Sequence, residues 1–100
     1  MSALIHGEGQ GAARVALGAG VMLRQAREAR NLTREAVAAR TRLELRVIDA
    51  LENEDYHSLA AAAFVKGYIR SISKELQIDP APVLAQYEQY VHTEEPALAD

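Results

Sequence analysis

The sequence predicts an all-α fold, a five-helix bundle, on three observations. Apolar residues recur at spacings of three and four from about residue 18 onward. Residues that typically begin or end helices lie between these apolar runs. No segment shows the strict apolar–polar alternation of a half-buried strand. We therefore expect one helical domain over 18–92, a flexible Gly-rich arm over 1–17 and a flexible tail over 93–100.

The first predicted helix begins near Gly18 and stops at Asn31, a residue type that is common just after helix ends. A second helix of about two turns follows over Arg34–Arg40. Thr33 is its expected N-cap, and Glu35 lies favourably in its positively polarised first turn.

The third predicted helix begins with a capping box, because Thr41 and Glu44 have the S/T-x-x-E spacing. It ends near Asn53 and carries its inward-facing apolar residues on one side: Leu43, Val47, Ile48 and Leu51.

Two longer helices complete the prediction. The fourth covers Ala62–Gln77, although the alanines at 60–63 leave its first residue open. The fifth begins at Pro80, is capped by Asp79 and runs through Val91, because proline is well tolerated in the first turn of a helix.

Composition and charge limit the function. The chain has 100 residues, 49% of them hydrophobic, and no cysteine, which is typical of one soluble domain in a reducing compartment. It has no apolar run long enough to span a bilayer. The net charge of −3 divides into +4 over residues 1–46 and −7 over residues 47–100. A basic half indicates an anionic partner, but the acidic half argues against a domain that wraps on phosphate.

We expect no enzyme activity, no cofactor and no metal site. His6, His57 and His92 have no second histidine at helical spacing, and cysteine ligands are missing. The acidic group at 52–55 lacks the alternating ligands and central glycine of a calcium loop. No serine stands in the sharp turn that exposes a nucleophile.

Residues 33–52 place two short helices around a tight connection, which is the pattern of a helix-turn-helix. Ala38 is small where the helices cross, and Leu43 fills the turn. Ile48 and Leu51 anchor the second of these helices to the core. The segment resembles the phage-repressor type of helix-turn-helix, so we expect the bundle to have a phage-repressor-like core.

Three segments together, 23–30, 47–52 and 64–70, resemble the cytoplasmic domain of the RodZ family over about residues 18–90. The resemblance implies a cytoplasmic adaptor that binds the actin-like filament protein MreB in bacterial cell-shape maintenance. It also implies a longer protein anchored in the inner membrane by a segment absent from this chain. The sequence departs from the family at Ala60, Ile72 and Gln77, where proline, tyrosine and glycine are expected.

The fourth predicted helix carries the candidate partner-binding residues. Phe64 and Tyr68 form a stripe beside the core stripe, and the resemblance implies that these aromatics are the filament contacts. The alternative is that both rings pack under the fifth helix or against Tyr56. Lys66 and Arg70, with Lys74, form a basic row that either meets an acidic partner or is a solvated face.

The rival function is sequence-specific DNA binding by a regulator of the phage-repressor type. In that case Arg34 and Arg46 would contact phosphate or guanine. Against it, Glu44 and Asp49 would face the groove between the phosphates, and their repulsion would oppose binding. Nucleic acid therefore stays the second candidate partner, after MreB.

Overall fold

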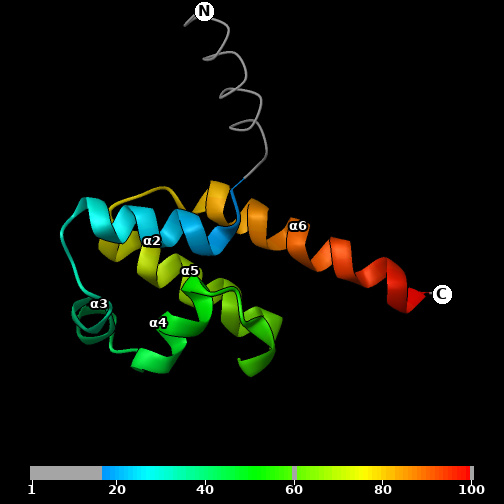
Figure 1. Cartoon of the computed structure of the whole chain (residues 1–100), viewed down its shortest axis with the longest axis horizontal. Coiled ribbons are helices and arrows are strands. Elements are labelled where there is room, and N and C mark those ends of the chain that lie inside the picture. Colours follow the sequence, from blue (N-terminus) through cyan, green and yellow to red (C-terminus); the bar gives the residue numbers. More distant parts are fainter. Residues whose placement is uncertain (1–16, 60, 100) are drawn as a thin grey trace, which may run out of the picture.

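The computed structural model describes residues 17–59 and 61–99, and from residue 93 onward only the helical backbone (Figure 1). Every regular element in these ranges is a helix, which confirms the predicted all-α class with five helices. They are α2 (Ala19–Ala29), α3 (Arg34–Thr41), α4 (Leu45–Glu52), α5 (Ala62–Leu76) and α6 (Pro80–Ala99), with a short 3-10 helix, η1 (Tyr56–Ser58), before α5. The arm predicted over 1–17 lies outside the described residues except for Leu17.

The helices enclose one core. α2 and α5 lie near each other in the middle of Figure 1, α3 and α4 lie below them, and α6 crosses behind α2 and projects to one side. Every one of the five helices contributes buried apolar side chains, among them Leu23, Val37, Ile48, Leu51, Ile69, Leu76 and Val83. The predicted core stripe of α5 is confirmed, since Val65, Ile69, Ile72 and Leu76 are all buried.

Most predicted helix ends are confirmed. α2 stops before Asn31, whose φ of 57° turns the chain into the left-handed region. The hydroxyl of Thr33 accepts a hydrogen bond from the amide of Ala36 at 3.0 Å, as an N-cap should. The carboxylate of Asp79 accepts one from the amide of Ala81 at 2.9 Å, so Pro80 does begin a helix.

The predicted capping box at Thr41 is wrong. Thr41 is the last residue of α3, and its hydroxyl donates back to the carbonyl of Val37 at 2.7 Å. The chain reverses only at Arg42, which has a φ of 62°, and α4 then begins after Glu44 without a side-chain cap. The reason is that a threonine hydroxyl can satisfy a carbonyl of the preceding turn as well as an amide of the next one.

The ends of α5 and α6 add detail that the sequence left open. α5 begins at Ala62 and ends before Gln77, whose φ of 59° is the left-handed conformation that glycine adopts most easily. A side chain there costs about 1 kcal/mol, at a position where the RodZ resemblance expects glycine. α6 continues past Val91 to Ala99, so its backbone is helical over most of the range expected to be a tail.

A close contact fixes the N-terminal end of α2 on the C-terminal end of α4. A Cβ atom on Gly20 would lie 2.3 Å from the carbonyl oxygen of Glu52, so only glycine fits. The amide of Gly20 donates a hydrogen bond of 3.0 Å to the carboxylate of Glu54, which follows α4. This carboxylate satisfies an amide that the first turn of α2 cannot pair internally, and its charge suits the positive end of the helix dipole.

Gly20→Ala should lower the free energy of unfolding by about 1–3 kcal/mol, because the new methyl group must push the α4 backbone away. Urea unfolding followed by circular dichroism measures the loss. Gly67→Ala is the matched control, since a Cβ there meets nothing within 4 Å and alanine favours a helix interior. We expect the control to be stabilised by about 0.5–1 kcal/mol; equal effects of both variants would contradict the close packing of α2 on α4.

Candidate functional site

The helix-turn-helix consists of α3, the turn over 42–44 and α4. The amide of Leu43 donates to the carbonyl of Ala38 at 3.1 Å, which closes the turn, and the Leu43 side chain packs partly buried against the core. Ala38 is 8% exposed, and Ile48 and Leu51 are 1% exposed each. The roles predicted for these four residues are confirmed.

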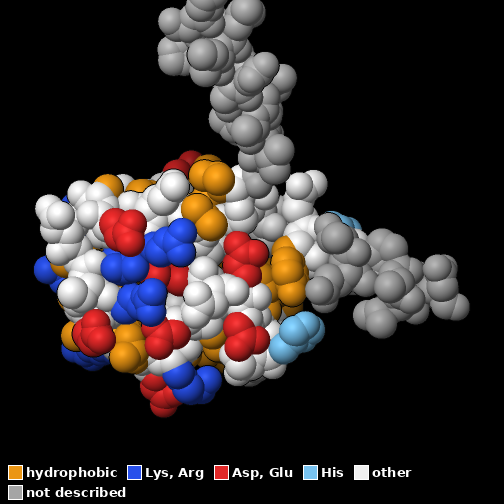
Figure 2. Space-filling model, in the orientation of Figure 1, with side chains coloured by type: hydrophobic (Ala, Val, Ile, Leu, Met, Phe, Trp, Pro, Cys, Tyr) orange, Lys and Arg blue, Asp and Glu red, His pale blue; other side chains and the backbone are white. Residues whose placement is uncertain are grey.

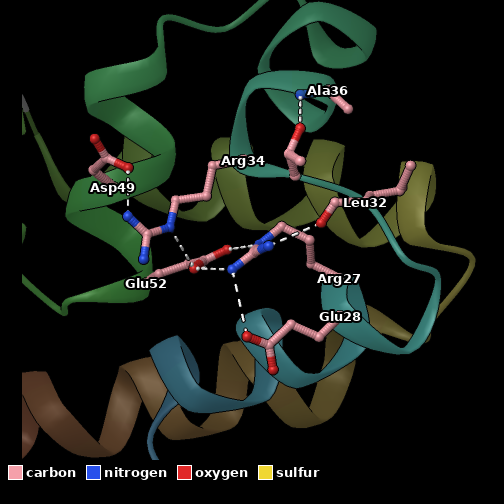
Figure 3. A network of polar contacts seen from close by, with 8 residues as sticks. Arg27, Glu28, Leu32, Arg34, Ala36, Asp49 and Glu52 are labelled. Atoms are coloured by element: carbon pink, nitrogen blue, oxygen red, sulfur yellow. Dashed lines mark hydrogen bonds and ion pairs between the residues drawn. The ribbon is translucent and has the colours of Figure 1, made fainter.

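A buried ion pair joins α4 to α2 (Figure 3). The guanidinium of Arg27 donates to both carboxylate oxygens of Glu52, from Nε at 2.6 Å and from Nη2 at 3.0 Å. Its Nη1 donates to the carbonyl of Leu32 at 2.8 Å, in the loop between α2 and α3. Hydrogen bonding to Glu52 raises the pKa of Arg27 above its usual value, so this side chain stays charged at any working pH.

Arg34, a candidate DNA contact, belongs to the same network. Its Nε lies 3.3 Å from the Glu52 carboxylate, and its Nη1 lies 3.3 Å from that of Asp49. Figure 3 shows the side chain crossing from α3 to these two acids of α4. A guanidinium held between two carboxylates has its charge largely compensated and little freedom to reach a phosphate.

The exposed start of α4 is the surface that a DNA groove would meet. Arg46 is exposed there, but its Nε lies 2.6 Å from the carboxylate of Glu44. Leu45 is 37% exposed beside it. On the face shown in Figure 2, basic and acidic side chains interleave instead of forming a basic stripe. This arrangement offers little of the net positive charge that drives binding to duplex DNA.

Phe64 and Tyr68 lie together on α5, as predicted. Phe64 is 58% exposed, the largest exposed fraction among the large hydrophobic side chains described. Its ring stacks on that of Tyr68, with centroids 6.5 Å apart and an interplanar angle of 26°. Tyr68 is half-buried against the core, so it supports the Phe64 ring from one side. An exposed aromatic ring that stacks on a half-buried neighbouring ring is typical of an anchor for a protein partner.

The aromatic partners of Tyr56 lie on α6 instead. Its ring meets those of Tyr87 and Tyr90 edge-on, with centroids 4.9 and 4.8 Å away. Burial raises the pKa of the Tyr56 hydroxyl, so this ring stays neutral and serves packing. α6 therefore packs on η1 through these rings, while Phe64 keeps the exposed surface described above.

The residues of the basic row on α5 have different surroundings. The ammonium group of Lys66 lies 2.6 Å from the carboxylate of Glu88, so it ties α5 to α6. Arg70 is exposed, and the described part of the chain holds no ion-pair partner for it. Of the four partner-binding candidates, the structure brings the two aromatics together and places Lys66 in a contact between helices.

The described residues contain no group of three or more His, Cys, Asp or Glu side chains that could hold a metal ion. Within the same ranges, no helix is both long enough and apolar enough to cross a membrane.

Comparison with known proteins agrees with this geometry. The model of a family described as "Helix-turn-helix domain" matches residues 22–83, more than half of the chain. The chain belongs to this helix-turn-helix family. Domains of this kind serve regulatory binding of nucleic acid or of protein.

An uncharacterised protein of Haemophilus influenzae is 41% identical over 63 residues, which are 62% of this chain and 21% of that protein. The chain thus spans about a fifth of that relative's length. No solved structure matches the chain.

Glu52→Gln should lower the free energy of unfolding by about 3–5 kcal/mol, because it leaves the buried Arg27 charge uncompensated. The matched control is Glu44→Gln, which breaks the exposed pair with Arg46 and should change stability by at most about 1 kcal/mol. Chemical denaturation of both variants gives the comparison. Similar small losses would show that the Arg27 pair does not hold α2 on α4.

Lys66→Gln should raise the pKa of Glu88 back toward its ordinary value, because the hydrogen bond and charge of Lys66 hold it below that value. Since the folded-state pKa is depressed, the pair favours the fold above the unfolded-state pKa and stops doing so as the pH falls through the folded one. Carboxyl ¹³C chemical shifts of the Glu88 side chain, recorded across the acid range, test this. An unchanged titration midpoint would contradict the contact between α5 and α6.

Proposed function

We propose that this domain is a non-catalytic adaptor of the RodZ type that binds the actin-like filament protein MreB through Phe64 and Tyr68 of α5. The observation that carries the proposal is the exposed ring of Phe64, 58% of it open to solvent and stacked on Tyr68. The family match supports a binding domain, and the resemblance of segments 23–30, 47–52 and 64–70 to RodZ supplies the partner.

The site suits a protein partner for a physical reason. An exposed phenyl ring loses its unfavourable hydration when a partner covers it, and rings held by a neighbour lose little entropy on binding. The ring is carried by the first turn of α5 rather than by a loop, and the buried residues Val65 and Ile69 hold this end of the helix on the core. The DNA alternative lacks comparable support, because Arg34 is engaged with Asp49 and Glu52.

In the full-length RodZ arrangement the domain would lie on the cytoplasmic face of the bacterial inner membrane. Repeated copies held near a polymer gain avidity, so a modest affinity of one domain for one filament subunit would suffice there.

Phe64→Ala should weaken co-sedimentation with polymerised MreB on the order of thirtyfold, the effect of losing a central aromatic anchor. Tyr68→Ala should also weaken it, by removing the base on which Phe64 stacks. Leu45→Ala is the matched control, since it removes an exposed apolar side chain from α4 instead. Thermal melts verify that each variant folds.

Two outcomes would contradict the proposal. One is that the unaltered chain does not pellet with filaments. The other is that Leu45→Ala and Phe64→Ala weaken binding equally. A steeply salt-dependent shift of duplex DNA that Arg46→Ala abolishes would favour the regulator instead.

A further inference from the structure

A polar hollow of about 390 Å³ lies between the end of α3 and the C-terminal half of α5. Its walls are Arg40, Thr41, Ser71, Lys74, Glu75 and Gln77. Lys74, the last residue of the basic row of α5, lines it, whereas Phe64, Lys66, Tyr68 and Arg70 do not.

Cations dominate the surroundings of the hollow. Glu75 is the acid in its lining, and it lies 3.6 Å from the guanidinium of Arg40. Lys74 is exposed and has no ion pair within the described residues. Arg30 reaches the rim, where its Nη2 donates to the side chain of Gln77 at 2.6 Å.

A simpler explanation is that these cations only complement the negative ends of two helices. Arg40 lies in the last turn of α3 and Lys74 in the last turn of α5. Each helix end contributes about half a negative charge. Two ends together with Glu75 therefore compensate roughly two of the three cations Arg40, Lys74 and Arg30. An excess of about one positive charge remains among the residues that line and border the hollow.

The hollow shares a face of α5 with the exposed aromatic pair. Phe64, Tyr68, Ser71 and Glu75 follow one another at spacings of four, three and four, which places them along one side of a helix. At 1.5 Å per residue, the distance along the axis from Phe64 to Glu75 is about 16 Å. A partner that buries about 800 Å² on this side would cover both features.

We propose that this hollow binds an acidic polypeptide segment, whose carboxylates are held by Arg40 and Lys74 while the same partner packs on Phe64. The inference rests on the proposed function in that the partner is the filament protein. Guanidinium groups suit carboxylates because they donate two parallel hydrogen bonds. The hollow is too small for a nucleic-acid duplex or a bilayer surface, because both bind over a broad basic area. The carboxylate of Glu75 within it would also repel closely spaced phosphates.

The first measurement uses hexaglutamate as a probe and needs no filament. Titrated into the 100-residue chain at low salt, it should shift the amide resonances of Ser71 and Lys74 more than those around Arg46. Lys74→Glu should remove these shifts, because it reverses an exposed charge that has no partner to lose. Arg46→Glu makes the same charge change on α4 and should leave them in place.

The second measurement is co-sedimentation with MreB filaments, where Lys74→Glu should weaken binding about tenfold and Arg46→Glu should not. Added salt should narrow this difference, because the contact is partly exposed. If the chain does not pellet with filaments but hexaglutamate still binds the hollow, the proposed partner is wrong and the site for an acidic segment is still supported.

Three results would overturn the inference itself. Hexaglutamate shifts spread evenly over all arginines would show nonspecific attraction. Equal effects of the two charge reversals on filament binding would show that the hollow takes no part. Phosphatidylglycerol vesicles that bind through Lys74 more tightly than hexaglutamate does would identify lipid phosphate as the ligand instead.

Discussion

The buried pair of Arg27 and Glu52 is the contact on which the arrangement of the first three helices depends. Two charged groups leave water here, and their desolvation is offset only because the guanidinium fork matches both carboxylate oxygens. The remaining Nη1 satisfies the carbonyl of Leu32, in the loop where the chain leaves α2. A shift of α4 along α2 would break these bonds together, so the pair fixes the register of the two helices.

Glu52 also contacts α2 through its backbone. Its carbonyl oxygen lies 2.3 Å from where a Cβ of Gly20 would be, and its carboxylate binds Arg27, seven residues later and two turns along the same face of α2. The contact at the glycine sets how closely the helices approach, and the ion pair sets their rotation. α5 then packs on α2 and α3, and α6 packs on α2 and α5.

These ion pairs change how the positive charge of the first half of the chain is interpreted. The first 46 residues carry an excess of +4, which in sequence indicates an anionic partner. Arg27, which is buried, and Arg34, which is partly exposed, both pair with acids of the second half of the chain. Lys74, which has no ion pair in the described residues, lies in the hollow where α3 ends beside α5, on the helix that also carries the exposed aromatic pair. The surface therefore combines an apolar anchor with a small cationic hollow, a combination that fits a protein surface better than a nucleic acid.

By itself, the sequence determined the helices, most of their ends and the helix-turn-helix, because apolar spacing, Thr33, Asn31 and the Asp79–Pro80 pair act within a few residues. It also placed Phe64 and Tyr68 on one stripe beside the core. It could not decide whether those rings were covered, because that depends on which residues of α6 meet Tyr56. It misassigned Thr41, because a threonine hydroxyl can bond either a carbonyl of the preceding helix or an amide of the next one. It also counted Arg27 and Arg34 as free surface charge. Only the tertiary structure decided those points and formed the hollow, since pairs such as Arg27–Glu52 and Arg40–Glu75 join residues far apart in the chain.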